Sequence, residues 1–149
     1  MKNDYLRRIS LAFLMTLVCV TVSYAYDFEV DSIYYNITSE SDYEVEVTYS
    51  SKYKELYSGD IVIPESVTYN GIAYSVTSIG ERAFYECEDL KSIDLPEGLT
   101  SIGKSAFYEC ESLTSIDLPD DLTSIGELAF GGCENLKSID LPEGLTRVY

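Results

Sequence analysis

Three aspartates and three serines recur at a spacing of 23 residues, and their side chains are the first candidates for chemistry in this chain. The aspartates are Asp94, Asp117 and Asp140. Each stands two positions after one of the serines, which are Ser92, Ser115 and Ser138. Carboxylate oxygens bind calcium, and exposed carboxylates also attract basic proteins. Carboxylates about 5 Å apart repel each other by about 1 kcal/mol even in water, and a bound cation would relieve that repulsion.

The sequence nevertheless favours a solvated acidic face over a calcium site. No glycine-rich calcium loop accompanies the aspartates. Lys91 and Lys137 stand on the same segments and neutralise part of the charge. We therefore expect no metal site.

Catalysis has few residues to use. The chain contains no histidine to serve as a general base, and no glycine-rich phosphate loop precedes a helical segment. Carboxylates in repeating, solvent-facing columns lie outside the water-excluding pockets that shift pKa values. The sequence therefore predicts a protein that is not an enzyme and that needs no cofactor.

The regular spacing comes from an internal repeat. Residues 77–145 are one 23-residue unit written three times, with 15 positions identical in every copy: TSIGERAFYECEDLKSIDLPEGL, TSIGKSAFYECESLTSIDLPDDL and TSIGELAFGGCENLKSIDLPEGL. A period of this length predicts a solenoid, in which each unit forms one coil that stacks on the next. The apolar constant positions would then form ladders, among them Phe84–Phe107–Phe130 and Cys87–Cys110–Cys133.

Each unit divides into a strand, a bend and an arc. Residues 92–95 alternate polar and apolar, which predicts a half-buried strand, and Pro96 ends it. Strands at equal spacing with a crossover between them predict a parallel sheet. Gly80 is expected at a bend that uses positive φ, and residues 81–88 are expected to form a tight helical turn or an irregular arc.

These residues resemble the leucine-rich repeat of the BspA type, also called the Treponema pallidum type. The pattern L-x-x-I-x-L-P-x-x-L-x-x-I-G-x-x-A-F-x-x-C is carried by Leu90, Ile93, Leu95, Pro96, Leu99, Ile102, Gly103, Ala106, Phe107 and Cys110. The resemblance covers residues 77–145 and implies a curved solenoid with its parallel sheet on the concave side and irregular or short helical arcs on the convex side. It also implies a bacterial surface protein, since members of the family often are, and some bind host matrix proteins or other bacteria.

The segments before and after the repeats are expected to extend the solenoid and to cap its N-terminal end. Residues 61–76 align with the unit as a degenerate first coil, in which Asn70-Gly71 predicts an inserted hairpin. Residues 26–60 are rich in alternating β-branched and aromatic residues and are expected to form a β-rich N-terminal cap. Residues 146–149 would start an incomplete coil.

The first 25 residues have the pattern of a Sec signal peptide. Lys2, Arg7 and Arg8 precede an apolar run, and the small residues at Ser23 and Ala25 suit cleavage after Ala25. The run is shorter than the roughly 20 residues that span a membrane. We therefore expect a secreted or cell-surface protein with no membrane insertion after cleavage.

Export would leave a strongly acidic chain. The formal net charge of the whole chain is −16, and residues 1–25 contribute three basic side chains and one acidic one. Nucleic acid is a poor partner because its recognition needs positive surface. A protein partner is expected instead, such as a basic host matrix protein or a bacterial surface protein.

Three cysteines remain after such processing, all at one position of the unit. Their Cβ vectors would run parallel, their number is odd, and a spacing of 23 residues is not a chelate spacing. Buried, reduced thiols are therefore favoured over disulfides or zinc.

The candidate interaction surface consists of the aspartate and serine columns together with Tyr85 and Tyr108 on the convex arc. Three functions fit: an adhesin-like protein-interaction module, a truncated repeat-family member without independent function, and a calcium-stabilised structural spacer. No C-terminal cap is visible after the last coil, whose apolar rim includes Phe130, Leu136, Ile139 and Leu141. Such a rim predicts end-to-end self-association.

Overall fold

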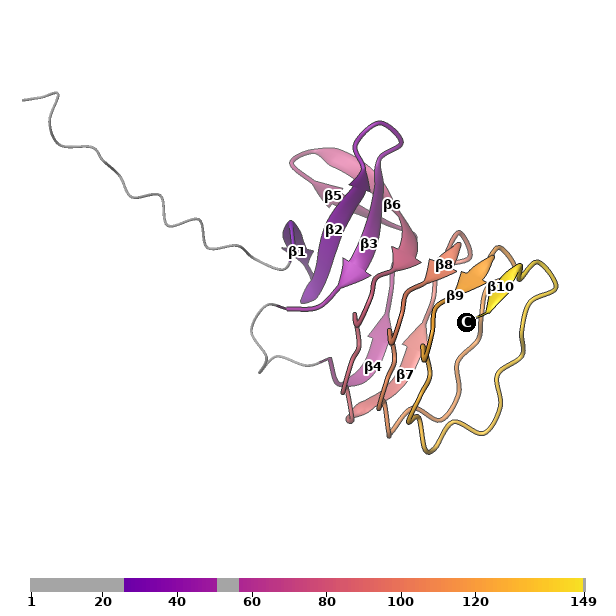
Figure 1. Cartoon of the computed structure of the whole chain (residues 1–149). Coiled ribbons are helices and arrows are strands. Elements are labelled where there is room, and N and C mark those ends of the chain that lie inside the picture. Colours follow the sequence, from indigo (N-terminus) through magenta and orange to yellow (C-terminus); the bar gives the residue numbers. More distant parts are fainter. Residues whose placement is uncertain (1–25, 51–56, 149) are drawn as a thin grey trace, which may run out of the picture.

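The computed structural model describes residues 26–50 and 57–148, which contain ten strands and no helix. The expected signal peptide, residues 1–25, lies outside the described residues. Among the residues that are described, no helix is long and apolar enough to cross a membrane. Figure 1 shows the strands arranged in a row of successive turns of the chain, with the N-terminal strands at one end.

Three strands lie at that end: β1 (Phe28–Val30), β2 (Ile33–Ser39) and β3 (Glu44–Thr48). They pair antiparallel in chain order. The turn between β1 and β2 is Asp31-Ser32, whose φ values of 50° and 65° suit a tight hairpin. The alternation in β3 buries Val45 and Val47 completely.

The next segment contributes strands to two sheets, the large one that contains β1 to β3 and a separate two-stranded one. Strand β4 (Gly59–Val62) pairs parallel with β7 (Leu90–Asp94) in a two-stranded sheet. Strands β5 (Ser66–Tyr69) and β6 (Ile72–Ile79) form an antiparallel hairpin whose turn is Asn70-Gly71, both with positive φ. Strand β6 also pairs parallel with β3 and so joins the N-terminal strands to the repeats.

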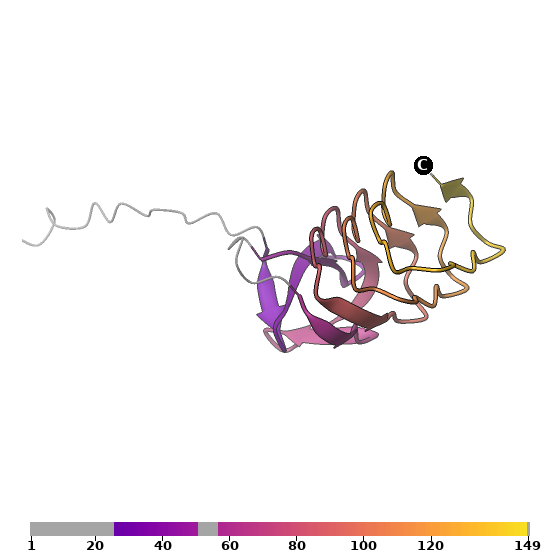
Figure 2. The same ribbon diagram turned by 90° about the horizontal axis from the view of Figure 1, so that it is seen from below.

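A parallel sheet then runs through the repeats, as the sequence predicts. It continues from β6 through β8 (Ser101–Ile102) and β9 (Ser124–Ile125) to β10 (Arg147–Val148). Partners lie one 23-residue period apart, for example Ser78 with Ser101. Figure 2, seen from below, shows the same row of coils, in which these short strands follow one another.

The position of this sheet within the unit corrects the sequence-based prediction. The strand expected at residues 92–95 forms in the first copy only, as part of β7, and the corresponding segments 115–118 and 138–141 are not strands. The inter-coil ladder instead follows the Thr-Ser-Ile segment. There the amide of Gly103 donates to the carbonyl of Ile79 at 2.8 Å, and that of Gly126 to Ile102 at 2.8 Å.

Gly80, Gly103 and Gly126 occupy one position of the unit, and this glycine column explains why the coils are closest along the Thr-Ser-Ile segment. A Cβ atom at Gly103 would lie 2.7 Å from the carbonyl carbon of Gly80, and one at Gly126 would lie 2.6 Å from that of Gly103. None of the three has positive φ. The expectation that Gly80 provides a positive-φ bend is therefore wrong. The position needs glycine because neighbouring backbones touch there.

The arcs of the repeats are irregular turns that bond to the next coil. The amide of Phe84 donates to the carbonyl of Ala106 at 2.7 Å, and that of Phe107 to Ala129 at 2.7 Å. Two positions of each arc have left-handed backbone, at Arg82 (φ 57°) and Glu86 (φ 56°) in the first copy. This alternation prevents a helix. Every second amide of the arc donates to the next coil, and the amides between them, such as that of Tyr85, donate three residues back within their own arc.

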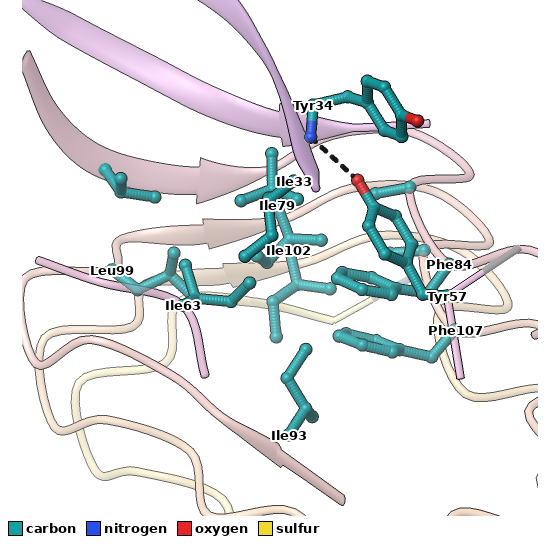
Figure 3. Close-up of a cluster of buried hydrophobic side chains, with 14 of the residues drawn as sticks. Ile33, Tyr34, Tyr57, Ile63, Ile79, Phe84, Ile93, Leu99, Ile102 and Phe107 are labelled. Atoms are coloured by element: carbon teal, nitrogen blue, oxygen red, sulfur yellow. Dashed lines mark hydrogen bonds between the residues drawn. The ribbon is translucent and has the colours of Figure 1, made fainter. Parts of the chain in front are cut away.

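Stacked aromatic rings run through the core, as the sequence predicts. The ring centroids of Phe84 and Phe107 are 5.0 Å apart, and those of Phe107 and Phe130 are 5.3 Å apart, with planes within 5° of parallel. Tyr57 adds a further ring at 4.6 Å from Phe84. Figure 3 shows Tyr57 over the two phenylalanines and bonded to Tyr34. Each such ring pair contributes about 0.5–1.5 kcal/mol beyond its burial.

The three described cysteines are free thiols. Cys87 and Cys110 are buried and Cys133 is half-buried. The Sγ atoms of Cys110 and Cys133 donate to the carbonyl oxygens of Phe84 and Phe107, at 3.1 and 3.0 Å. These two thiols therefore bond to the backbone of the preceding coil, whereas Cys87 Sγ lies 4.0 Å from the carbonyl oxygen of Tyr85 in its own coil.

Candidate interaction surface

The aspartate column is exposed along the stack of coils. The side chains of Asp94, Asp117 and Asp140 are all exposed, one at the same position of each copy. Between the first and second copies lies a groove of about 350 Å³, lined by Ile93, Asp94, Leu95, Glu97, Asp117, Leu118, Pro119 and Asp120. Four carboxylates therefore border this opening, whose exposed lining is mostly polar.

Glu97 and Asp120 were not predicted as site residues, although the sequence held a signal for them. They occupy one position of the unit, and Glu143 occupies it in the third copy. An acidic residue thus follows each proline of the repeat. This second acidic column lies beside the first and doubles the charge of the groove.

The serine column differs from coil to coil. The hydroxyl of Ser92 donates to the Asp60 carboxylate at 2.7 Å, across the pairing of β4 with β7. Ser115 and Ser138 are exposed. Asp60 adds a carboxylate that the sequence analysis missed, although alignment of Ile61 with Ile93 places it opposite Ser92.

The acidic side chains do not form a metal centre in the part of the chain that the structure describes. There, no three aspartate, glutamate, cysteine or histidine side chains lie close enough together to hold a metal ion. Each coil contributes one carboxylate to each column, so the carboxylates are spread along the surface. This arrangement offers several separate contacts to a large cationic partner.

Two ion pairs lie on the arc side of the coils. Lys104 Nζ lies 2.6 Å from Glu127 Oε2 across adjacent coils, and its bond and charge lower the pKa of Glu127. Arg82 lies 4.0 Å from its neighbour Glu81. These side chains are mostly exposed, and pairs of this kind contribute little to stability.

Tyr85 and Tyr108 stack on each other on the arc. Their ring centroids are 5.3 Å apart with an interplanar angle of 9°, and both side chains are half-buried. The guanidinium carbon of Arg82 lies 5.6 Å from the centroid of the Tyr85 ring. In the third copy the position is Gly131, where a Cβ would meet the Tyr108 ring at 3.0 Å. The structure thus contains two separate candidate surfaces, the acidic groove and the tyrosine stack.

The comparisons with known proteins agree on one family. The family model described as "BspA type Leucine rich repeat region (6 copies)" matches residues 60–149. No curated protein matches the chain.

Solved structures give the same result. A leucine-rich repeat protein from Bacteroides ovatus is 40% identical with a TM-score of 0.72, over 80% of this chain and 30% of that one. A leucine-rich repeat protein from Bacteroides capillosus is 34% identical with a TM-score of 0.70, over 81% of this chain and 86% of that one. A leucine rich cell surface protein from Faecalibacterium prausnitzii is 26% identical with a TM-score of 0.63, over 80% of this chain and 37% of that one.

This chain thus spans less than a third of the Bacteroides ovatus protein and most of the Bacteroides capillosus protein. The family match extends beyond the three near-identical units into strand β4, which pairs with the first of them. The repeats, their parallel pairing and the match over residues 60–149 together show that the chain belongs to the BspA type leucine-rich repeat family.

Proposed function

We propose that this chain is an exported, adhesin-like module that binds basic proteins through its acidic surface. The observation that carries the proposal is the groove bordered by four carboxylates, Asp94, Glu97, Asp117 and Asp120. A groove between two coils can hold side chains of a partner, and the carboxylates select cationic ones. Leucine-rich repeats are compatible with this role, since they commonly serve as protein-binding modules and not as enzymes.

The net charge of the chain supports the choice of partner. At −16 the chain repels nucleic acid and anionic membrane surfaces, and it accelerates encounter with basic proteins by electrostatic attraction. Host matrix proteins and bacterial surface proteins with basic patches fit this requirement. The cell-surface description of the Faecalibacterium prausnitzii protein supports a surface or secreted location.

The proposal includes a division of the chain. Residues 1–25 would direct export and be removed, and residues 26–60 would cap the stack at the end where β3 pairs with β6. Residues 61–76 would be a degenerate first coil, 77–145 the three repeats and 146–149 the start of a further coil. The whole would form a curved solenoid with arcs on its convex side.

Self-association of the isolated chain is a second part of the proposal. Of the rim expected on the last coil, Leu141 is 56% exposed, whereas Phe130, Leu136 and Ile139 are half-buried. Leu128 of the same coil and Val148 in β10 are also exposed, at 54% and 61%. Exposed apolar side chains at the end of a stack favour association when they form a contiguous patch. Light scattering of dilute samples would detect it, and a strictly monomeric chain over a wide concentration range would contradict it.

A pull-down tests the proposed function. The chain without residues 1–25 is immobilised and exposed to extracellular-matrix proteins and to bacterial surface extracts. We expect it to retain basic proteins, and we expect Asp117→Lys to lose them without unfolding. The matched control is Glu40→Lys, which makes the same charge change in an exposed turn of the N-terminal strands. Equal retention by both variants would remove the groove from the proposal.

A further inference from the structure

The paired rings of Tyr85 and Tyr108 form a small aromatic platform on the arc of the first two copies. They stack nearly parallel at 5.3 Å and remain half-exposed. The third copy ends the column with Gly131, so no third ring covers Tyr108 from that side. Phe84 and Phe107 are buried in the core, whereas the two tyrosine rings are half-exposed and available for contacts outside it.

Arg82 shows which group this platform accepts. Its guanidinium carbon lies 5.6 Å from the centroid of the Tyr85 ring, within the range of about 6 Å at which a cation is attracted to an aromatic face. Among the described residues, its ion-pair partner is Glu81, at a distance of 4.0 Å. The first ring therefore already interacts with a guanidinium group from the chain itself.

The second ring lacks this partner. The residue that corresponds to Arg82 in the second copy is Ser105, which is buried and carries no charge. Both residues have left-handed backbone, with φ of 57° and 51°, so the two arcs have the same course at this position. Tyr108 therefore lacks an arginine at this position of its own coil, and its ring is bordered by Tyr85 and by Gly131.

Carboxylates stand beside the rings. Partial burial raises the pKa of Tyr85, and the Glu86 and Glu109 carboxylates raise it further. Both glutamates follow their tyrosine directly, and Gly132 replaces them in the third copy. An aromatic face with adjacent carboxylates meets the two requirements of a guanidinium group, a flat surface to stack on and oxygens to accept its N–H bonds.

We propose that Tyr108, together with Tyr85, Glu86 and Glu109, is a docking site for an arginine side chain from a basic segment of a partner protein. This inference rests on the proposed function, since it assigns part of the basic-partner binding to a defined site on the arc. It adds selectivity, because the carboxylates of the groove attract lysine and arginine alike. Stacking on tyrosine favours the planar guanidinium over the ammonium group.

Binding of an oligo-arginine peptide and an oligo-lysine peptide of equal length tests the site. Isothermal titration calorimetry on the chain without residues 1–25 should give about two- to fivefold tighter binding of the arginine peptide. Tyr108→Leu should abolish that preference, and Tyr108→Phe should keep it. The third copy lacks a ring at this position, so the fold tolerates its removal.

A second variant tests the role of Arg82. Arg82→Ser introduces the residue of the second copy and frees the Tyr85 ring, so the affinity for the arginine peptide should rise beyond the effect of charge. The control is Arg147→Ser, which also removes one exposed arginine and also introduces the residue of the preceding copy, Ser124. A greater gain for Arg82→Ser than for Arg147→Ser supports the site, and equal gains contradict it.

The outcomes separate this inference from the proposed function. If the chain binds both peptides equally, and Asp117→Lys weakens binding while Tyr108→Leu does not, the tyrosine site is wrong and the acidic groove remains. If it binds neither peptide, both proposals fail. If a neutral oligosaccharide binds and Tyr108→Leu abolishes its binding, while the arginine peptide does not bind, the two rings bind a carbohydrate and the inference is overturned.

Discussion

The ring of Tyr57 packs on the ring of Phe84 with centroids 4.6 Å apart, so the aromatic column of the repeats continues into the segment that precedes them. The hydroxyl of Tyr57 donates to the carbonyl of Thr48 at 2.8 Å and accepts from the amide of Tyr34 at 3.0 Å. One side chain therefore connects the core of the first coil to strands β2 and β3.

Substitution of this tyrosine should separate its two roles. Tyr57→Phe keeps the ring and removes both hydrogen bonds, so we expect the free energy of unfolding to fall by about 1–3 kcal/mol. Urea denaturation would measure the change. Tyr43→Phe is the control, because Tyr43 is 50% exposed and should lose little. Equal stability of both variants and the parent would show that the junction does not depend on the Tyr57 hydroxyl.

Removal of the middle ring should be more damaging. Phe107 is fully buried between Phe84 and Phe130, so Phe107→Ala leaves a cavity that costs about 3–5 kcal/mol. Circular dichroism should show a large fall in the melting temperature or loss of the folded state. A melting temperature within a few degrees of the parent would contradict the stacked core.

The same glycine-to-alanine substitution should be damaging inside the glycine column and harmless outside it. Gly103→Ala places a Cβ 2.6 Å from the amide nitrogen of Glu81 and 2.9 Å from the carbonyl oxygen of Gly80. Backbone atoms cannot move aside as a side chain can, so we expect a loss of about 1–3 kcal/mol or more. Gly98→Ala is the matched control, since nothing lies within 4 Å of its Cβ. Equal melting temperatures of the two variants would refute the close approach of the coils.

Alkaline pH should weaken the fold through its buried thiols. Burial raises the pKa of Cys87 to about 12, whereas an exposed thiol has a pKa of about 8.5. The folded state therefore holds this proton more tightly. Its contribution is fully present below about pH 8.5 and is lost as the pH rises towards 12, at about 1.4 kcal/mol per pH unit.

Denaturation curves at pH 7, 9 and 10 would measure this loss. Cys87→Ala should make the decline between pH 9 and 10 shallower, although the variant starts from a lower stability. Burial also raises the pKa of Tyr35 and Tyr57, which act at higher pH because an exposed tyrosine ionises near pH 10. The same slope in the parent and in Cys87→Ala would rule out the thiol as the cause.

Much of the fold follows from the repeat itself. Identical side chains one period apart must stack when the coils stack, so the Phe84–Phe107 pair, the parallel sheet and the family could be predicted from the sequence. Which segment of the unit forms the hydrogen-bonded ladder between coils could not be predicted, because residues 78–79 and 92–95 both alternate polar and apolar. The choice depends on where glycine lets the backbones touch, and that contact is visible only in three dimensions.

The candidate surfaces were predicted in part. Exposure of Asp94 and Asp117 follows from their alternation with buried isoleucines, and Glu97 could have been found from the acidic residue that recurs after each proline. The contact of Arg82 with Tyr85 could not be found in this way. It depends on left-handed backbone at a position that arginine, serine and leucine occupy in turn, and no residue type there indicates that conformation.

The salt dependence of binding to basic proteins tests the central claim most directly. Matrix proteins ordered by isoelectric point are titrated with the chain without residues 1–25, at low salt and at about 0.5 M salt, where charges are strongly screened. We predict that affinity increases with the basicity of the partner and falls steeply with salt, and that Asp117→Lys lowers both the affinity and its salt dependence. Binding that is as tight for acidic partners, or that salt leaves unchanged, would contradict the proposal.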